Sequence, residues 1–130
     1  MVVTLAYLDT SAAMKLLVAE PESEALRREL SSDGRQLVAS WLLHTELHCA
    51  VGRRLAQVSA ERVLDLLDAV ELIDLSRGDL VAASAHAPLG AGDAIHLAVA
   101  VRLGVDEMIS YDAELARAAT AVGLRVLAPK

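Results

Sequence analysis

The stretch Val2-Val-Thr-Leu-Ala-Tyr-Leu8, followed at once by Asp9-Thr-Ser11, decides the fold of this chain. Its first seven residues are mostly apolar, with β-branched side chains near the start, which predicts a buried strand over 2–8. Asp9 ends this strand, and a short helix is predicted over 11–19. In open α/β sheets, sites form beyond the carboxyl ends of the strands. The place of Asp9 therefore makes it the first candidate site residue.

Strand and helix patterns alternate along the rest of the chain. Strands separated by helices predict an α/β domain with right-handed crossovers. We expect three layers, α/β/α, in a Rossmann-like arrangement around a short, mostly parallel sheet. Asp93 is expected to open a helix after the flexible loop 88–92. The further strands are predicted at 36–39, 70–75, 107–110 and 125–127, and the further helices at 21–30, 41–57, 60–69, 77–87, 93–103 and 112–122.

Length and composition narrow the classes of protein. A chain of 130 residues predicts one domain over 1–130, and 55% hydrophobic residues exclude an intrinsically disordered chain. One cysteine, Cys49, excludes a disulfide scaffold, fits a cytoplasmic location, and is expected to be an inert core residue. No apolar run reaches the roughly 18 residues of a membrane-spanning helix, so no membrane partner is expected.

The charge and the aromatic content exclude two kinds of nucleic-acid binder. The net charge is −6, from 12 Lys and Arg against 18 Asp and Glu. A field of that sign repels phosphate, which excludes a non-specific nucleic-acid binder. Base-stacking modules need aromatic platforms, and the chain has only Trp41, Tyr7 and Tyr111. Acidic residues gathered in one place would instead bind a cation, which reverses the local sign.

Four carboxylates from separate segments are candidates for such a site. Asp9 and Asp112 each follow a strand, Asp93 follows a glycine loop, and Glu46 lies in a helix after the second strand. Two carboxylates about 5 Å apart repel by roughly 3 kcal/mol at an effective dielectric constant of about 20. Their convergence would therefore require either protonation or a divalent cation. Oxygen ligands suit Mg²⁺ or Mn²⁺, which align water and phosphate for displacement.

These residues lie in motifs that resemble the PIN-domain ribonucleases, and above all the VapC-type toxins of type II toxin–antitoxin pairs. The likeness covers nearly the whole chain, in order and at the usual spacing. The final motif usually has Thr two residues before the Asp, and Ser110 keeps that hydroxyl here. The motifs are Tyr7-Leu-Asp-Thr-Ser-Ala12, Thr45-Glu-Leu47, Asp93-Ala-Ile-His-Leu-Ala98, and Ser110-Tyr-Asp112 with the Ala116, Ala119 and Gly123-Leu-Arg-Val126 that follow.

The resemblance implies a function and a set of site residues. It implies Mg²⁺- or Mn²⁺-dependent endonucleolytic cleavage of RNA, with 5′-phosphate and 3′-hydroxyl ends, by a homodimer that a cognate antitoxin inhibits. Its acidic quartet of catalytic and metal-binding residues corresponds to Asp9, Glu46, Asp93 and Asp112, and its supporting hydroxyl to Thr10 or Ser11.

Several cations and histidines near these motifs have a second interpretation. Lys15, Arg53 and Arg54 are candidates for contact with RNA or with an acidic antitoxin segment, although they equally suit ordinary surface positions. His44 and His48 share one helix face, and Glu46 points away from it, which disfavours a zinc site of the protease type. We therefore expect both histidines to face away from the cleft.

Two other functions remain open from the sequence. A non-catalytic PIN-like binding module would have the same fold and take up no metal. A phosphotransfer domain is less favoured, because a dehalogenase-like phosphatase has a second Asp two residues after its nucleophile, where this chain has Ser11. A receiver domain would need an acidic pair after the first strand, which is not present.

Overall fold

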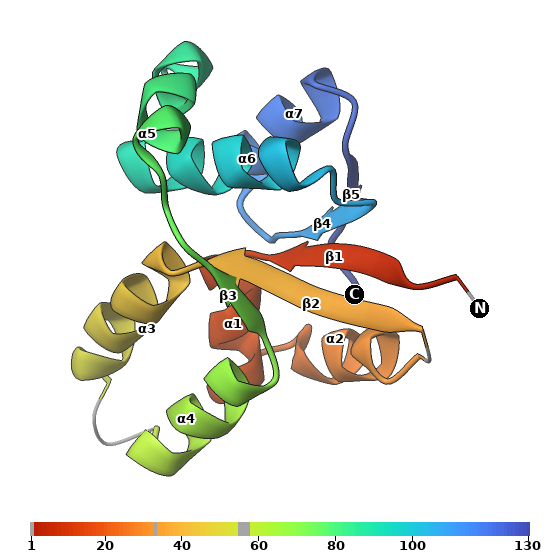
Figure 1. The fold of residues 1–130 in the computed structure, drawn as a ribbon. Helices are drawn as coiled ribbons and strands as arrows, with labels where there is room; N and C mark the ends of the chain where they lie inside the picture. The colour runs from red at the N-terminus through yellow and green to blue at the C-terminus, as the bar shows by residue number, and fades with distance from the viewer. Residues whose placement is uncertain (1, 33, 55–57) are drawn as a thin grey trace.

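The computed structural model describes residues 2–32, 34–54 and 58–130. In these ranges the strands form one sheet with the order β3-β2-β1-β4-β5 (Figure 1). All four pairings are parallel, which confirms the predicted α/β class and parallel sheet. The strands are β1 (Thr4–Leu8), β2 (Arg35–Ser40), β3 (Glu71–Ile73), β4 (Glu107–Ile109) and β5 (Arg125–Leu127).

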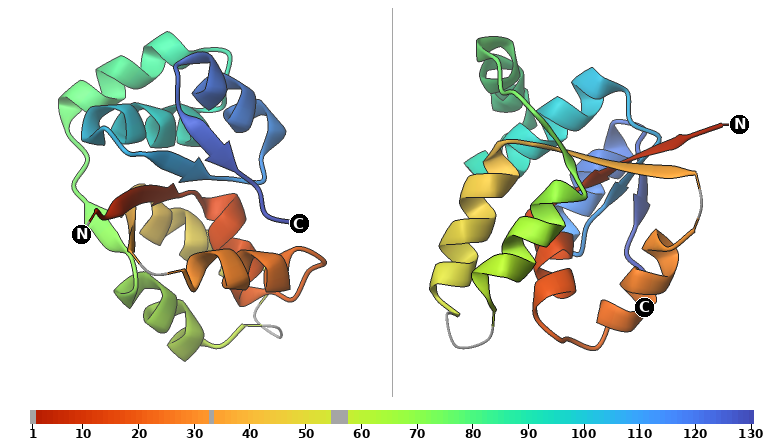
Figure 2. Two further views of the ribbon diagram at one scale, coloured as in Figure 1. Left: turned by 90° about the vertical axis from the view of Figure 1, so that its right-hand side faces the viewer. Right: turned by 60° about the horizontal axis from the view of Figure 1, so that its bottom comes forward.

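Helices cover both faces of the sheet, as three layers require. The views in Figures 1 and 2 place α1 to α4 on one face and α5 to α7 on the other. None of the helices in the described ranges combines the length and apolar character needed to span a bilayer. The helices are α1 (Thr10–Leu17), α2 (Ser23–Leu30), α3 (Leu42–Gly52), α4 (Ala60–Asp68), α5 (Arg77–Ala83), the 3₁₀ turn η1 (Ser84–His86), α6 (Ala91–Leu103) and α7 (Ala113–Ala121).

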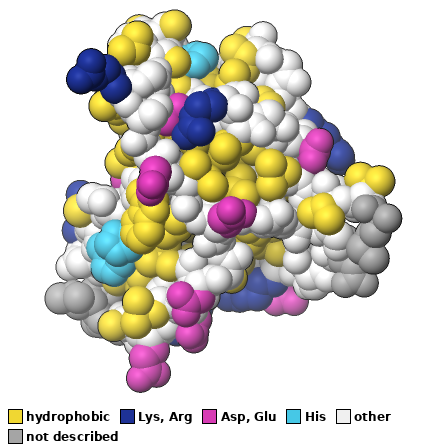
Figure 3. Space-filling view, viewed as in Figure 1, with side chains coloured by type: hydrophobic (Ala, Val, Ile, Leu, Met, Phe, Trp, Pro, Cys, Tyr) yellow, Lys and Arg dark blue, Asp and Glu magenta, His cyan; other side chains and the backbone are white. Residues whose placement is uncertain are grey.

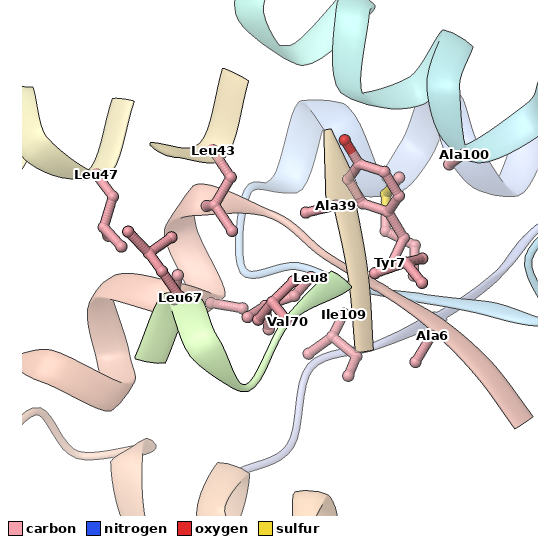
Figure 4. Packing of buried hydrophobic residues seen from close by; sticks show 14 of the residues in the cluster. Ala6, Tyr7, Leu8, Ala39, Leu43, Leu47, Leu67, Val70, Ala100 and Ile109 are labelled. Carbon is pink, nitrogen blue, oxygen red and sulfur yellow. The ribbon is translucent and has the colours of Figure 1, made fainter. Parts of the chain in front are cut away.

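The central strand β1 forms the middle of the core. Tyr7 and Leu8 are fully buried, because helices cover both faces of the sheet and successive side chains point to opposite faces. Leu8 lies with Leu67 and Val70 in Figure 4. The hydroxyl of Tyr7 lies on the other side of the sheet, where it reaches α6. Both faces of β1 are therefore fixed by packing, and so is the direction in which Asp9 leaves the sheet.

The prediction that Asp93 opens a helix was wrong by two residues. Helix α6 begins at Ala91, Gly90 is its N-cap in an extended conformation (φ −58°, ψ 153°), and Asp93 lies in the first turn. The glycines predicted a loop, but Gly92 has helical backbone and lies against another side chain, as described below. Tertiary contact, rather than local preference, sets this boundary.

Cys49 is exposed, so its prediction as a core residue was also wrong. The buried residues of α3 are Leu43, Leu47 and Val51, which recur at every fourth position and define one helix face. Cys49 follows Leu47 by two residues and is turned about 200° away from that face. The predicted end of this helix, at Gln57, lies outside the described residues.

A buried carboxylate ties α5 to α6. The two oxygens of Asp79 accept hydrogen bonds from Arg102, at 2.6 Å from Nε and 2.9 Å from Nη2. Asp79 also forms a capping box with Ser76 at the start of α5. The hydrogen bond from Arg102 is the main reason why the pKa of Asp79 lies below its usual value.

We expect Asp79→Ala to lower the free energy of unfolding by about 2 kcal/mol, because it removes a cap and charge-assisted hydrogen bonds. The unfolded carboxyl titrates near a pKa of about 3.9. Since folding lowers the pKa, this stabilisation is complete above that value and is lost as the pH falls through the lower folded value. Urea unfolding of both proteins at pH 7 and at pH 3 measures the difference.

The control is Asp65→Ala, at an exposed position of α4. Its effect should stay within about 0.5 kcal/mol at either pH. An Asp79→Ala variant as stable as the Asp65→Ala variant at pH 7 would contradict the structural role of Asp79.

Candidate functional site

The first carboxylate, Asp9, is held where β1 and β4 end side by side. Leu8 pairs with Ile109, so the next residues, Asp9 and Ser110, leave the sheet together. Ser110 Oγ donates to Asp9 Oδ2 at 2.5 Å, and Ser11 Oγ donates to both oxygens at 2.7 and 2.9 Å. Burial raises the pKa of Asp9, and these donors partly offset that effect. The two predicted supporting serines thus both orient Asp9.

Three of the four carboxylates lie at helix N-termini. Asp9 caps α1 by accepting from the Ala12 amide at 2.9 Å, and Asp112 caps α7 by accepting from the Leu115 amide at 2.9 Å. Asp93 lies in the first turn of α6. The positive end of a helix dipole stabilises a carboxylate there by about 0.3–1 kcal/mol. These helix ends offset part of the repulsion that a set of acidic side chains would otherwise suffer.

The fourth carboxylate, Glu46, reaches the same region from the middle of α3. Thr10 Oγ1 donates to Glu46 Oε1 at 2.8 Å, and His96 Nε2 donates to the same oxygen at 2.5 Å. Partial burial raises the pKa of Glu46, but the hydrogen bond from His96 and the one from Thr10 outweigh it, so the pKa lies below its usual value. Glu46 is therefore ionised at neutral pH.

The electrostatic surroundings of Asp93 include the other three carboxylates. Burial is the largest cause that raises the pKa of Asp93, and the value reaches about 6. The negative charges of Asp112, Asp9 and Glu46 add to this effect. Residues that are distant in sequence thus share one electrostatic environment beyond the carboxyl ends of β1 and β4.

The four carboxylates are suitable ligands for a hard divalent cation, although their side chains do not form a complete coordination site. Among the residues that the structure describes, no three His, Cys, Asp or Glu side chains are spaced to hold a metal ion. Asp9, Glu46 and Asp112 are held instead by hydroxyl, amide or imidazole donors. Carboxylate oxygens are the ligands that Mg²⁺ and Mn²⁺ prefer, and a cation would relieve the charge repulsion that adds to the effect of burial on the pKa of Asp93.

The candidate cations lie in different settings. Lys15 Nζ is 2.9 Å from a carboxylate oxygen of Glu20 and 2.9 Å from one of Glu22, so two negative charges share its positive charge. Arg53 and Arg54 are exposed just after α3. Contact of these three residues with RNA or with a partner stays a prediction.

The two histidines of α3 turn away from Glu46, as their spacing predicted. The rings of His44 and His48 have centroids 4.4 Å apart, and the ring of Trp41 is 5.4 Å from that of His44. His48 is exposed and its Nδ1 donates to the carbonyl oxygen of His44. The two rings therefore belong to a different face of α3 from the side chain that joins the carboxylates.

Sequence reasoning missed two residues that surround Glu46. His96 is 1% exposed and contacts Glu46 directly, and a Cβ atom placed on Gly92 would lie 2.5 Å from Glu46 Oε2. His96 lies in the motif that begins at Asp93, and Gly92 immediately precedes that motif, so one signal was available. No pattern within that motif indicates that its partner is a residue of α3.

Known proteins share this fold and much of this sequence. A sequence model of the family described as the PIN domain matches residues 6–121. Ribonuclease VapC46 of Mycobacterium tuberculosis is 40% identical over 127 residues, which cover 95% of this chain and 96% of the relative.

Solved structures also resemble the fold, among them the following two. The VapC20 toxin of Mycobacterium tuberculosis, described as cleaving the sarcin–ricin loop, has a TM-score of 0.75 at 15% identity and covers 95% of this chain and 99% of its own. A toxin–antitoxin complex from Klebsiella pneumoniae has a TM-score of 0.68 at 19% identity, with coverage of 96% and 98%.

Proposed function

The chain belongs to the PIN-domain family, and from this premise we propose that it is a divalent-metal-dependent endoribonuclease, the VapC-type toxin of a type II toxin–antitoxin pair. One observation carries the proposal. The side chains of Asp9, Glu46, Asp93 and Asp112 come from four segments, and burial together with the charges of the other three raises the pKa of Asp93. Residues 1–130 then form one PIN domain.

The four carboxylates are the proposed ligands of Mg²⁺ or Mn²⁺. A divalent cation held by carboxylates supplies the Lewis acidity that polarises a phosphodiester and makes water a better nucleophile. Ser11 and Ser110 fix both oxygens of Asp9, and Thr10 fixes one oxygen of Glu46. These hydroxyl groups limit the movement of the ligands, so that less order has to be created when the cation and RNA bind.

RNA reaches the site through local charge rather than through the field of the whole protein. The net charge is −6, and on the face in Figure 3 Lys and Arg are scattered singly among other side chains. The bound cation and Arg53 and Arg54 supply positive charge where the phosphates lie. A cytoplasmic location, where RNA is available as substrate, is part of this proposal.

A cognate antitoxin and a second copy of the chain are the proposed protein partners. Family membership and the toxin–antitoxin complex with the same fold support the antitoxin. An antitoxin segment that carries Arg would compete with the cation for the four carboxylates. An antitoxin that contacts only the far side of the domain would contradict this competition.

We expect the purified protein to cleave RNA with Mg²⁺ or Mn²⁺, to stop cleaving when EDTA is added, and to leave 5′-phosphate ends.

Mn²⁺ at about 100 times its dissociation constant should stabilise the protein by roughly 2.7 kcal/mol, which thermal unfolding measures without RNA. The quadruple variant of Asp9, Glu46, Asp93 and Asp112 to Asn or Gln is the control and should gain nothing from Mn²⁺. Cleavage that continues in EDTA would reject the metal-dependent mechanism, and stabilisation without cleavage would favour a binding module.

A further inference from the structure

A chain of hydrogen bonds runs from the sheet to Glu46. The Ser40 amide donates to the hydroxyl oxygen of Tyr7 at 3.0 Å. That hydroxyl lies 2.6 Å from His96 Nδ1, and His96 Nε2 lies 2.5 Å from Glu46 Oε1. Ser40 ends β2, Tyr7 lies in β1, His96 in α6 and Glu46 in α3. The chain therefore connects four elements of the fold to one carboxylate oxygen.

The chemistry of the groups fixes the direction of each hydrogen bond. An ionised carboxylate only accepts, so the hydrogen between His96 and Glu46 belongs to Nε2. In the neutral imidazole Nδ1 is then the acceptor, and Tyr7 donates to it. The phenol oxygen of Tyr7 in turn accepts from the Ser40 amide. Every group is satisfied in this arrangement: Glu46 fixes the tautomer of His96, and Tyr7 is the donor that this tautomer needs at Nδ1.

Burial makes this arrangement rigid. Tyr7 is 0% exposed and His96 1%, and their rings meet edge to face with centroids 5.6 Å apart. Neither side chain can turn to solvent for another partner. A buried polar group that loses its partner costs about 1–3 kcal/mol, which holds His96 in this orientation.

The two oxygens of Glu46 consequently have different surroundings. Oε1 accepts hydrogen bonds from both Thr10 and His96. Oε2 lies so close to Gly92 that a Cβ atom there would be 2.5 Å away, and among the described residues no donor contacts it. Gly92 adjoins Asp93. One oxygen is thus occupied by the protein, and the other lies beside the carboxylate site.

We propose that Tyr7 and His96 are positioning residues that hold Glu46 Oε1, so that Oε2 is presented to the divalent cation. The inference rests on the proposed function, because the cation is the one that the four carboxylates would bind. It adds a role for two residues that are not carboxylates. Partners of this kind commonly orient metal ligands, and their loss costs about 10- to 100-fold in affinity or activity.

Three variants test the proposal with Mn²⁺ as the probe. His96→Leu removes the donor and should weaken Mn²⁺ binding, measured by calorimetry without RNA, by about 10- to 100-fold. The kcat for RNA cleavage should fall in parallel when it is measured at a fixed Mn²⁺ concentration. His96→Gln keeps an N–H donor and should restore most of both. Tyr7→Phe leaves Nδ1 without its donor and should cost about two- to tenfold.

The matched control is His48→Leu, the same change at a histidine on the face of α3 that is turned away from Glu46. This variant should leave Mn²⁺ affinity and kcat unchanged. Wild-type Mn²⁺ affinity in His96→Leu would overturn the proposal, and so would equal losses in His96→Leu and His96→Gln. If His96→Leu does not fold, Tyr7→Phe decides, and unchanged Mn²⁺ affinity there overturns the proposal. A wild-type protein that neither binds Mn²⁺ nor cleaves RNA rejects the proposed function itself, and this inference with it.

Discussion

Asp9→Asn is expected to slow RNA cleavage at least about 100-fold, with little change in melting temperature. Loss of a group that only orients a metal ligand lowers affinity or activity by about 10- to 100-fold. Loss of the ligand's own charge should therefore lower the cleavage rate by at least the upper value of that range. Asp9 is the most constrained of the four carboxylates, because Ser11, Ser110 and the Ala12 amide all donate to it. Single-turnover cleavage of a labelled RNA with saturating Mn²⁺ measures the effect.

The fold should survive the Asp9→Asn change because an amide can replace each hydrogen bond. The amide oxygen accepts from the Ala12 amide and from Ser11, and the amide nitrogen donates to the hydroxyl oxygen of Ser110, whose hydrogen rotates away. Asp65→Asn on the exposed face of α4 is the matched control and should cleave RNA at the wild-type rate. Undiminished cleavage by Asp9→Asn would remove Asp9 from the catalytic set.

Gly92→Ala should separate activity from stability. The added Cβ atom would lie 2.5 Å from Glu46 Oε2, closer than real Cβ contacts, so the carboxylate has to move by about 1 Å. That movement breaks the hydrogen bonds that Thr10 and His96 donate to Glu46. A misplacement of 1 Å can cost about 100-fold in rate, so we expect cleavage to fall by about 10- to 100-fold.

The stability of Gly92→Ala should be equal to that of the wild type or higher. Alanine in place of a helical glycine stabilises a helix by about 0.5–1 kcal/mol, and the atom that must move is the end of a flexible side chain. Gly52→Ala is the control, since Gly52 ends the same helix as Glu46 and a Cβ there meets no described atom within 4 Å. Full cleavage activity in Gly92→Ala would show that the position of Glu46 Oε2 does not matter.

The elements that the sequence predicted well are those with local causes. Ser59 caps α4 as predicted, because its hydroxyl accepts from an amide three residues later. Gly123 ends α7 with φ +92°, a conformation that glycine adopts without strain. The strand predicted from Val2 begins instead at Thr4, because pairing with β2 starts at Thr4 and Arg35. The end of a strand depends on the neighbouring strand, and the local sequence pattern carries no information about that neighbour.

The candidate site divides in the same way. The four carboxylates were predicted because each follows a strand or lies in a recognisable motif. Their shared environment beyond the sheet follows from parallel strands, whose carboxyl ends meet at one edge. The roles of His96 and Gly92 could not be predicted, because both depend on the side chain of Glu46. Lys15 was a candidate for phosphate contact, yet its pairing with Glu20 and Glu22 depends on how the α1–α2 connection folds back.

The sequence by itself determined the alternation of strands and helices and the four acidic positions, because periodicity and motif spacing act over a few residues. Only the tertiary structure decided which oxygen of Glu46 is held and which is free. Thr10 and His96, which donate to Glu46, lie 36 and 50 residues from it in the sequence. Tyr7 lies 89 residues from His96, its hydrogen-bond partner. Hydrogen bonds act through space at about 3 Å, so partners this distant in sequence are chosen by packing alone.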